Sequence, residues 1–415
     1  MLTKRRDACW YIRILIPISH VQSYGHEFQE HQFELAYSCP ACKKGGVQEF
    51  QVLAEYPDGK VHCRECGHVL NDNVSDWKDS LLASIEWADA VGFQRAVNPE
   101  HIELMKLAKS KGKWIFTIDD DDYFNVPTWN TGYDYYVKRR EYIEQTFKLA
   151  DAVNVTTPTL KHLYGQLNPN VQLIPNANDI EMIEATPPAP NAPMFRIQRE
   201  KGSREAKVVP THIQEYLNAR QGKKVYWWGG SPTHEEDLKH VIAPLRSLMN
   251  REPDAIVCFM GYVHRAAIAV LPPERLFLFG IVPVMHYFSV LKLIGHDFLF
   301  APVDFNDFNA SKSANKALEA DALGVIPICS DFHTYRHAFK RGFYSDNTEY
   351  GWNRAFKYAH QLSAEERETY KSENLEWVKK YYDIKATAPL WAKFFETGKA
   401  EHNIYDDLLR EGEAK

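Results

Sequence analysis

Short apolar segments alternate with amphipathic ones along most of the chain, and this alternation constrains the fold more than any other feature. It predicts a parallel sheet with helices on both faces, which is an α/β fold. In the first half of the chain the strand-like runs are 11–17, 88–97, 113–119, 151–157 and 171–177, and the helical patterns are 74–88, 99–112, 136–150 and 158–167.

A second alternation follows. A proline-rich stretch at 185–193 and a charged stretch at 199–207 separate it from the first and mark an exposed connection. Two βαβ lobes joined by a linker place a ligand cleft between them, at the carboxyl ends of the strands. The strand-like runs of the second alternation are 223–230, 254–261, 275–280, 297–303 and 325–331.

The predicted domain boundaries follow these patterns. The divisions are 1–36 with 74–184 for a first lobe, 37–73 for a cysteine-containing insertion, 185–224 for a linker or insertion, 225–375 for a second lobe and 376–415 for a helical C-terminal segment.

Composition excludes several classes of protein. The chain has 415 residues, 45% hydrophobic and 25% charged, which excludes wholesale disorder, a collagen-like repeat and a coiled coil. Its net charge of −6 gives no global basic field for nucleic acid or anionic lipid. The apolar run 14–18 is too short for a signal peptide, and a proline, a histidine and a lysine interrupt the stretch 276–295. We therefore predict neither a secretion signal nor a membrane span.

Four of the seven cysteines form two C-x-x-C pairs, Cys39 with Cys42 and Cys63 with Cys66, separated by 20 residues. Each pair places two sulfurs on one tight turn, and two such turns complete a tetrahedral thiolate cage for Zn²⁺. Because four cysteines fill the coordination sphere, we predict a structural zinc ribbon with no open catalytic position. Two redox pairs fit less well, since neither pair opens a helix after a strand.

The other three cysteines, Cys9, Cys258 and Cys329, are isolated in apolar contexts. Buried thiols with a metal site are typical of a reducing compartment, so we expect a cytoplasmic protein. The ribbon itself has two interpretations. It is either a metal-stabilised surface insertion or a docking module for nucleic acid or protein, and its basic residues are offset by acidic ones.

A glycine turn ends the strand-like run at 223–230 and opens a helix. Gly229 and Gly230 let the backbone turn sharply, and Ser231 or Thr233 is placed to cap the helix. The free N–H groups of a helix N-terminus suit a diphosphate. The alternative is an ordinary capped turn, because Gly-Gly-Ser alone is weak evidence.

The segment 305–331 carries a stronger signal. Lys312 and Ser313 lie at the start of a predicted helix, and Lys316 and Glu319, three residues apart, share one of its faces. An ammonium group suits a phosphate, and a carboxylate accepts hydrogen bonds from two ribose hydroxyls, so this face suits a nucleotide. Taken alone, the pair would be read as a surface ion pair.

Four consecutive aspartates, 119–122, follow the strand-like run that begins at 113. Clustered carboxylates raise one another's pKa or bind a cation, and the carboxyl edge of a parallel sheet favours function over solvated turn acids. Asp120 and Asp121 are therefore candidates for a catalytic base. His20 and His26, in the polar loop after the first strand-like run, are two more.

Three segments, 149–179, 225–238 and 308–331, give the chain a resemblance to a known family. They make it similar to the GT-B glycosyltransferases, and among these to the retaining, nucleotide-sugar-dependent glycosyltransferase family 4. The resemblance implies two Rossmann-like lobes with an interlobe cleft and a zinc-ribbon insertion in the first lobe. It also implies a C-terminal helix, within 376–415, that crosses back to the first lobe.

The segment 308–331 is the most specific of the three. In the family, a Glu followed by a small-residue helix and a Gly before a strand holds the ribose of the donor, and Glu319 matches that position. The family's earlier Glu is replaced by Ser311, so recognition of the donor sugar must differ.

The diphosphate position also departs from the family pattern. Ser231, His234 and Glu235 stand where the family has Arg and Lys. The resemblance then implies that the two lysines of segment 308–331, with Ser313 between them, take over the phosphate role.

The resemblance implies a hexosyl- or pentosyltransferase that moves a sugar from a nucleotide-diphosphate sugar to an acceptor hydroxyl. In retaining enzymes of this type the leaving phosphate can accept the acceptor proton, so no protein base is obligatory, and the chemistry generally needs no metal. One candidate acceptor is a hydroxymethylated DNA base, extruded while the ribbon docks on the duplex. The other candidate acceptors are a cell-surface polysaccharide, a lipid-linked glycan and a small metabolite. The alternative function is a catalytically degenerate GT-B protein that binds nucleic acid or protein through the ribbon.

Overall fold

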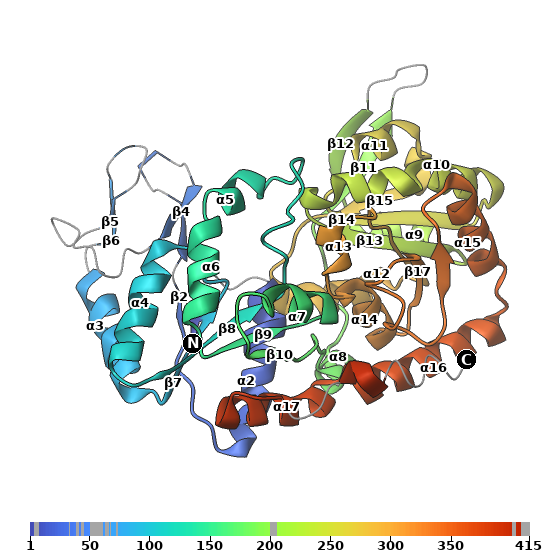
Figure 1. Cartoon of the computed structure of the whole chain (residues 1–415). Helices are drawn as coiled ribbons and strands as arrows, with labels where there is room; N and C mark the ends of the chain where they lie inside the picture. The colour runs from blue at the N-terminus through green and yellow to red at the C-terminus, as the bar shows by residue number, and fades with distance from the viewer. Residues whose placement is uncertain are drawn as a thin grey trace. The chain divides into compact units, whose positions relative to one another are not determined.

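The computed structural model describes residues 1–3, 8–32, 34–38, 41–42, 45–49, 61–62, 66, 68–71, 74–199, 206–400 and 404–407. The chain divides into two compact units. Unit 1 contains Met1–Thr128, Gly132–Pro175 and Ala388–Ile404, and unit 2 contains Trp129–Thr131, Asn176–Thr387 and Tyr405–Lys415. Helix α17 (Ile384–Thr397) therefore begins in unit 2 and ends in unit 1 (Figure 1).

Unit 1 is built around a six-stranded sheet in the order β10-β9-β8-β7-β1-β2, in which all neighbouring strands are parallel. Strand β9 is buried at every position, as expected for a parallel strand covered on both faces. The strands are β1 (Leu2–Thr3), β2 (His31–Gln32), β7 (Ala90–Gln94), β8 (Trp114–Asp119), β9 (Ala152–Val155) and β10 (Val171–Leu173).

The helices of unit 1 connect these strands. Helix α4 begins at Pro99 after a capping box formed by Asn98 and His101, and the left-handed Gly112 follows its end, as its sequence indicates. The helices are α1 (Ala8–Trp10), α2 (Ile16–Val21), α3 (Val74–Trp87), α4 (Pro99–Ser110), α5 (Tyr133–Val137), α6 (Arg140–Leu149) and α7 (Pro158–Tyr164).

The prediction of a strand at 11–17 is wrong. This segment forms a π-helical turn, η1 (Tyr11–Leu15), that runs into α2, and a 3-10 turn, η2 (Gln22–Tyr24), follows. The apolar run is buried nearly all round, so it lacks the periodicity that separates a buried helix from a buried strand. Arg13 is buried too. Its guanidinium donates to the Ile174 carbonyl at 2.9 Å and lies 4.8 Å from the centre of the Trp391 ring, and these contacts compensate the burial of its charge.

Two small antiparallel pairs of strands lie in the region of the cysteine motifs. Strand β3 (Glu34–Ser38) pairs with β4 (Gly45–Glu49), and β5 (Val61–His62) pairs with β6 (Val69–Asn71). In sequence, one C-x-x-C pair falls inside each connection. Cys42 is half-buried and Cys66 is exposed, whereas Cys39 and Cys63 lie outside the described residues. The zinc ribbon stays a prediction.

Unit 2 contains an eight-stranded sheet in the order β12-β11-β15-β14-β13-β16-β17-β18. The pairs from β15 to β18 are parallel, and β11 runs antiparallel to both of its neighbours. The strands are β11 (Met194–Arg199), β12 (Ala206–Thr211), β13 (Lys224–Gly230), β14 (Ala255–Gly261), β15 (Leu276–Phe279), β16 (Phe298–Ala301), β17 (Ile326–Ser330) and β18 (Phe343–Ser345).

The helices of unit 2 follow the second alternation. They are α8 (Ile180–Ala185), α9 (Ile213–Ala219), α10 (Glu235–Arg251), α11 (Arg265–Val270), α12 (Tyr287–Ile294), α13 (Asp307–Ala310), α14 (Asn315–Ala322), α15 (Glu349–Gln361) and α16 (Ala364–Tyr381), with 3-10 turns η3 (Pro232–His234), η4 (Pro273–Arg275) and η5 (Val284–His286). The stretch 185–224, expected as a linker or insertion, holds β11, β12 and α9 of this unit.

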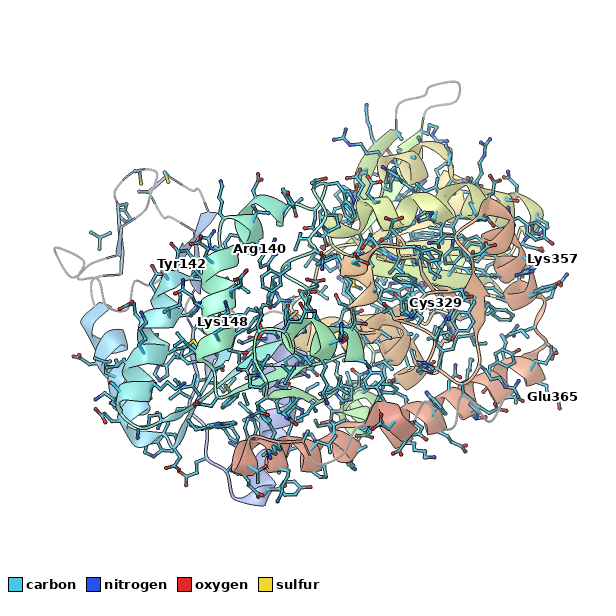
Figure 2. The ribbon with its side chains drawn as sticks, in the orientation of Figure 1. Arg140, Tyr142, Lys148, Cys329, Lys357 and Glu365 are labelled. Atoms are coloured by element: carbon cyan, nitrogen blue, oxygen red, sulfur yellow. The ribbon has the colours of Figure 1, made fainter. Side chains whose placement is uncertain are left out.

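The core of unit 2 joins α10 and α15 to the central strands. Leu245 of α10 and Trp352 of α15 belong to one buried cluster with Trp228 of β13 and Phe259 of β14. Cys329 of β17 lies fully buried in the same unit (Figure 2). Among the described residues, no helix combines the length and the apolar character that a membrane crossing requires.

Candidate functional site

Glycines end the two central strands of the unit 2 sheet. Gly230 of β13 pairs in register with Gly261 of β14, at the carboxyl edge of both strands. Gly261 has a left-handed φ of +82°, and a Cβ there would lie 2.6 Å from the Gly230 carbonyl oxygen. The Tyr262 N–H donates to that oxygen at 2.9 Å. Only glycine fits this close approach, which leaves main chain exposed at the edge of the sheet.

The predicted capping of the helix after Gly230 is wrong. Helix α10 begins at Glu235, as predicted, but the 3-10 turn η3 comes before it, and neither Ser231 before η3 nor His234 before α10 makes a side-chain capping bond. The Ser231 and Thr233 hydroxyls instead bond to each other at 2.6 Å. Three acidic residues occupy the first turn of α10 and already complement its dipole, so the helix end alone is a poor anion site.

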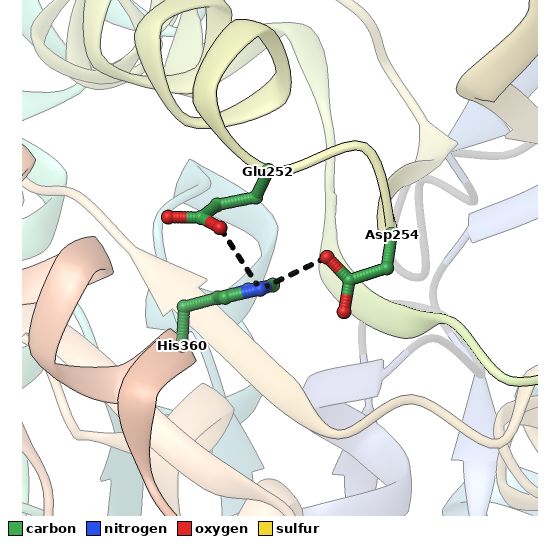
Figure 3. A group of neighbouring side chains, drawn as sticks. All are labelled: Glu252, Asp254 and His360. Atoms are coloured by element: carbon green, nitrogen blue, oxygen red, sulfur yellow. Dashed lines mark hydrogen bonds and ion pairs between the residues drawn. The ribbon is translucent and has the colours of Figure 1, made fainter.

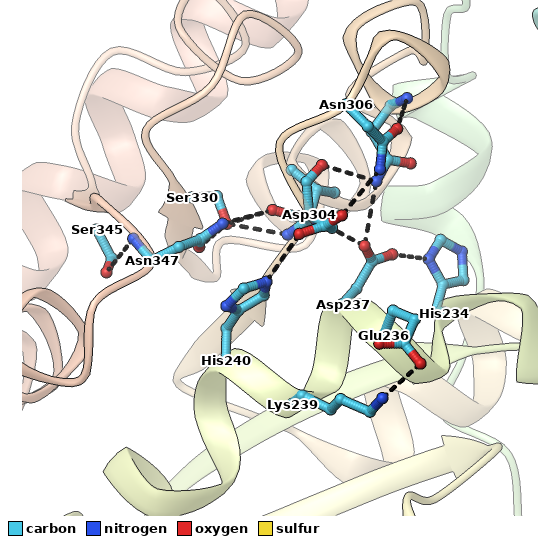
Figure 4. A network of polar contacts seen from close by, with 12 residues as sticks. His234, Glu236, Asp237, Lys239, His240, Asp304, Asn306, Ser330, Ser345 and Asn347 are labelled. Carbon is cyan, nitrogen blue, oxygen red and sulfur yellow. Dashed lines mark hydrogen bonds and ion pairs between the residues drawn. The ribbon is translucent and has the colours of Figure 1, made fainter. Parts of the chain in front are cut away.

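His234 is held by a buried carboxylate at the start of α10 (Figure 4). Its Nδ1 lies 2.7 Å from Asp237 Oδ2, and the other oxygen of Asp237 accepts from the Asp304 N–H at 2.7 Å and from Asn309 Nδ2 at 3.1 Å. Asp237 is 1% exposed. Burial opposes its charge, but the hydrogen bond from His234 and the backbone of Asp304 hold its pKa below the usual value.

The tautomer of His234 follows from these contacts. Burial, and then the charge of Lys316, lower the pKa of His234 to about 3, so the imidazole is neutral at pH 7. Because the Asp237 carboxylate can only accept, Nδ1 carries the proton. Nε2 then accepts, and the Lys316 ammonium lies 3.4 Å from it.

Lys316 and Glu319 lie on α14 as the spacing indicated, on the face that meets His234. The Lys316 ammonium is 5.8 Å from the centre of the Trp228 ring, and Glu319 Oε2 accepts from the Tyr287 hydroxyl at 2.8 Å. Tyr287 begins α12, and its ring packs near Trp227.

The pKa values of Lys316 and Glu319 are shifted from their usual values. Burial, and then the neighbouring Lys312, lower the pKa of Lys316 to about 8. Burial raises the pKa of Glu319 to about 7, against the opposing effects of the Tyr287 hydrogen bond and of Lys316. Perturbed acids and bases gathered at a sheet edge are typical of a binding or catalytic site.

Three further polar residues lie between α13 and α14. Lys312 lies over the Phe308 ring at 4.5 Å, and the Ser313 hydroxyl oxygen is buried without a hydrogen-bond partner. Ser311 donates to the Phe308 carbonyl at 2.8 Å and is fully buried. This buried hydroxyl stands where the family 4 pattern, which the sequence resembles, has a Glu.

The residues that the sequence nominated for donor binding all lie in unit 2. Gly229, Gly230, Ser231 and His234 lie at the carboxyl end of β13 or directly after it, Lys312 and Ser313 lie between α13 and α14, and Lys316 and Glu319 lie on α14. Sequence reasoning missed two functional candidates. Asp237 carried a signal in its i,i+3 spacing from His234. Tyr287, 32 residues before its partner, carried none.

The acidic cluster of unit 1 is engaged with an arginine. Arg95 Nη2 lies 3.0 Å from Asp120 Oδ1 and 2.8 Å from Asp121 Oδ2, and it also reaches Cys9 Sγ at 2.8 Å. Burial opposes the charge of Asp120, but Arg95 holds its pKa below the usual value. Arg95 itself has a φ of +54°, a strained conformation for a residue other than glycine.

The neighbouring aspartates accept hydrogen bonds from residues of the same turn. Burial raises the pKa of Asp119 to about 7, and the Tyr123 hydroxyl donates to its Oδ1 at 3.1 Å. Asp122 accepts the N–H groups of Phe124 and Asn125 and so shapes the turn.

The two candidate histidines lie in other segments of unit 1 than the acids. His20 lies in α2, where its Nδ1 is 3.2 Å from the Ile16 carbonyl oxygen. His26 packs against Phe395 and lines a pocket of about 500 Å³ with Ala90 and Val91, the first residues of β7. That pocket is at the amino edge of the unit 1 sheet, whereas Asp120 follows β8 at the carboxyl edge.

Comparisons with known proteins identify the fold. Neither a protein-family model nor a curated protein sequence matches this chain. Among solved structures, HepE from Anabaena in complex with UDP and glucose matches with a TM-score of 0.60 and 10% identity, over 95% of this chain and 99% of that chain. A glycosyltransferase from Rickettsia africae matches with a TM-score of 0.51 and 11% identity, over 80% of each chain.

A third match is the N-terminal domain of Candida albicans trehalose-6-phosphate phosphatase, with a TM-score of 0.52 and 13% identity over 77% of this chain and 73% of that chain. At such identities the likeness concerns the fold alone. The chain shares the GT-B fold of glycosyltransferases, which confirms the predicted α/β class and the coarse resemblance. The narrower placement in family 4 stays a prediction.

Proposed function

We propose that this chain is a glycosyltransferase that binds a UDP-sugar at the carboxyl edge of the unit 2 sheet. One observation carries the proposal: Glu319, Lys316 and His234 converge beside the Gly230–Gly261 close approach. A carboxylate, an ammonium and exposed main chain are the groups that recognise a ribose and a diphosphate. The GT-B fold shared with HepE, a protein solved with UDP and glucose, supports this assignment.

Glu319 would hold the ribose. Its Oε2 already accepts from Tyr287 at 2.8 Å, which orients the carboxylate and leaves Oε1 for sugar hydroxyls. The Tyr287 hydrogen bond also opposes the rise in the pKa of Glu319 that burial causes, so more of the carboxylate is ionised near neutral pH. Tyr287 is therefore a positioning residue in this proposal.

Lys316 would hold the diphosphate. The neutral His234 accepts from the Lys316 ammonium and, through Asp237, is fixed to α10, so the charge is held in place. Lys312 adds a second positive charge, and the buried, unpartnered Ser313 hydroxyl adds a donor. These side chains would take the role of the family's Arg and Lys.

The proposed reaction is a transfer with retention of anomeric configuration. The bond between the anomeric carbon and the β-phosphate oxygen breaks, the acceptor oxygen bonds to that carbon, and the acceptor proton passes to the leaving phosphate. Lys316 and Lys312 stabilise the charge that develops on that phosphate. This route is supported by unit 1, where Asp120 and Asp121 are ion-paired with Arg95 rather than poised as bases.

For the acceptor we propose a hydroxymethylated base in DNA, bound by unit 1 with the help of the predicted zinc ribbon. The support is the pair of small hairpins, β3–β4 and β5–β6, in whose connections the four cysteines fall. A gel shift with duplex DNA at rising salt tests this acceptor, because phosphate contacts must weaken as salt rises. Retention of the complex without any salt dependence would count against it.

The test of the function is a donor-hydrolysis and transfer assay with UDP-glucose and other UDP-sugars, in the presence and absence of DNA that contains 5-hydroxymethylcytosine. We expect UDP release by the wild-type chain and a strong rise in donor KM for Glu319→Ala. Glu365→Ala, an exposed acid at the start of α16, is the matched control. Failure of the wild-type chain to bind any UDP-sugar would refute the proposal, and binding without turnover would favour the degenerate GT-B alternative.

A further inference from the structure

A second group of ligating side chains lies in unit 2, away from the proposed donor site. Among the residues that the structure describes, this group consists of Glu252, Asp254 and His360 (Figure 3). A carboxylate oxygen of each acid and an imidazole nitrogen of the histidine lie within 4.8 Å of one another. Asp254 directly precedes β14, whose carboxyl end is Gly261. The group is therefore at the amino edge of the sheet, opposite the glycine turns.

Local sequence explains why two of the three side chains converge. Glu252 is the residue directly after α10, Asp254 directly precedes β14, and Pro253 lies between them. The Ala255 N–H donates to the Glu252 carbonyl at 3.1 Å, so residues 252–255 form a β-turn with Pro253 at its second position, and this tight turn keeps the two acids close together. His360 lies near the end of α15, which packs against α10.

The distances suit a single ion. His360 Nε2 lies 3.1 Å from Asp254 Oδ1 and 3.6 Å from Glu252 Oε2. With metal–ligand bonds near 2.1 Å, two ligand atoms at octahedral or tetrahedral angles are separated by about 3.0–3.4 Å. The first separation lies inside this range and the second is slightly longer, so an ion could be accepted with side-chain shifts of a few tenths of an ångström.

The other ring nitrogen of His360 has the partner that a metal ligand needs. Nδ1 lies 3.0 Å from the hydroxyl of Tyr226, which is fully buried, and the two rings are stacked at 11°. His360 is itself only 6% exposed. Such outer hydrogen bonds fix the orientation and tautomer of a ligating histidine, and here they direct Nε2 toward the two carboxylates.

Nearby cations do not occupy the ligand atoms. Arg251 binds Glu252 through Oε1, the oxygen that faces away from His360, at 2.9 Å. Lys224 donates to the His360 backbone carbonyl, and Arg275 donates to the backbone carbonyl of Glu252 at 3.0 Å. Both carboxylates are partly exposed, at 23% and 38%, so solvent can reach and complete the coordination of an ion.

We propose that Glu252, Asp254 and His360 bind a divalent transition-metal ion, Zn²⁺ or Mn²⁺, that fastens α15 to the connection between α10 and β14. One imidazole and two carboxylates favour these ions over Mg²⁺, which prefers an all-oxygen shell. The ion would act on the stability of unit 2, because it joins segments more than 100 residues apart in the chain. The inference is independent of the proposed transferase function.

The experiment measures metal content and stability of the full chain after EDTA treatment, reloading with Zn²⁺ or Mn²⁺ and gel filtration. We expect His360→Gln, which keeps a hydrogen-bond donor at this position, to hold one Zn²⁺ fewer per chain than the wild type. Asp254→Asn should lose the same ion, and it provides a second variant should the first not fold. Glu274→Gln, an exposed acid of the neighbouring turn η4, should keep the wild-type content.

The absorption spectrum of bound Co²⁺ distinguishes the predicted cysteine site from the proposed His360 site. Co²⁺ bound to thiolates gives intense sulfur-to-metal charge transfer, whereas Co²⁺ in a His–carboxylate site does not, so His360→Gln should leave the charge-transfer band unchanged. Saturating Zn²⁺ should raise the Tm of unit 2 by about 5 °C in the wild type and not in His360→Gln. Equal metal content in both proteins, or an equal Tm difference with and without metal, would overturn the proposal.

Discussion

Replacing Tyr287 with phenylalanine tests whether its hydrogen bond keeps Glu319 ionised in the candidate donor site. The substitution removes the hydroxyl that donates to Glu319 Oε2 at 2.8 Å and leaves the ring in place. A hydrogen bond to a charged group contributes about 1.5–3 kcal/mol. Its loss should raise the pKa of Glu319, already raised to about 7 by burial, by about one to two further units.

The consequence for binding depends on pH. If UDP binds the ionised carboxylate, the variant should bind UDP about 3- to 25-fold more weakly than the wild type at pH 7.5. At pH 9.5, where Glu319 is ionised in both proteins, the difference should fall below about 1.5-fold. The variant binds more weakly at the lower pH because its Glu319 has the higher pKa, and the difference disappears as rising pH ionises this carboxyl group in both proteins.

The assay is calorimetric titration of UDP into both proteins between pH 6.5 and 9.5. The ratio of the two Kd values cancels effects that act equally on both, including the titration of Lys316. Tyr216→Phe is the matched control, because it removes a buried hydroxyl that donates to the Ile294 carbonyl at 2.7 Å elsewhere in unit 2. A ratio that does not change with pH would refute the reasoning.

Four other changes test separate parts of the structure. Lys316→Met should weaken UDP binding about 10- to 100-fold and abolish the loss of affinity that the wild type should show above about pH 8, as measured by the same titration. Gly261→Ala places a methyl group 2.6 Å from the Gly230 carbonyl oxygen at a left-handed φ, so it should lower both the Tm and UDP affinity; unchanged values would show that the two turns can separate. Arg95→Met leaves buried acids without their partner and should destabilise unit 1 by about 3 kcal/mol at pH 7, with the difference narrowing as pH falls below about 4, because a depressed carboxyl pKa stabilises only above the unfolded value. Cys42→Ser should remove one thiolate-bound Zn²⁺ per chain by elemental analysis, and unchanged zinc would exclude the ribbon.

Much of the fold was predictable because it follows from local periodicity. The alternation of apolar strands and amphipathic helices identified β8 and β13 to within one residue and β7 to within three. The same argument failed at Tyr11–Leu15, where burial on nearly every side erases the period and a buried arginine binds inside the core. The segment 185–224, which holds β11 and β12, was assigned to a linker or insertion because a proline-rich stretch and a charged stretch lie in it, and these features do not reveal strands.

The candidate site was predictable only where its residues are close in sequence. Lys316 and Glu319 share a helical face, and their spacing placed them together. Tyr287 and Asp237 reach the site from other helices, and which residue meets Glu319 is decided by packing of α12 against the sheet rather than by any local pattern. The His360 cluster was unpredictable for the same reason, since its members are 106 residues apart.

In the proposed function, the Glu319 carboxylate of unit 2 binds the ribose of a UDP-sugar. The most direct test is to compare UDP with its 2′-deoxyribose analogue by calorimetric titration against the wild-type chain and Glu319→Ala. The wild type should prefer UDP by about tenfold or more, since a hydrogen bond to a charged carboxylate is lost with the hydroxyl, and the variant should bind both nucleotides equally. The same preference in both proteins would place the ribose elsewhere and contradict the account.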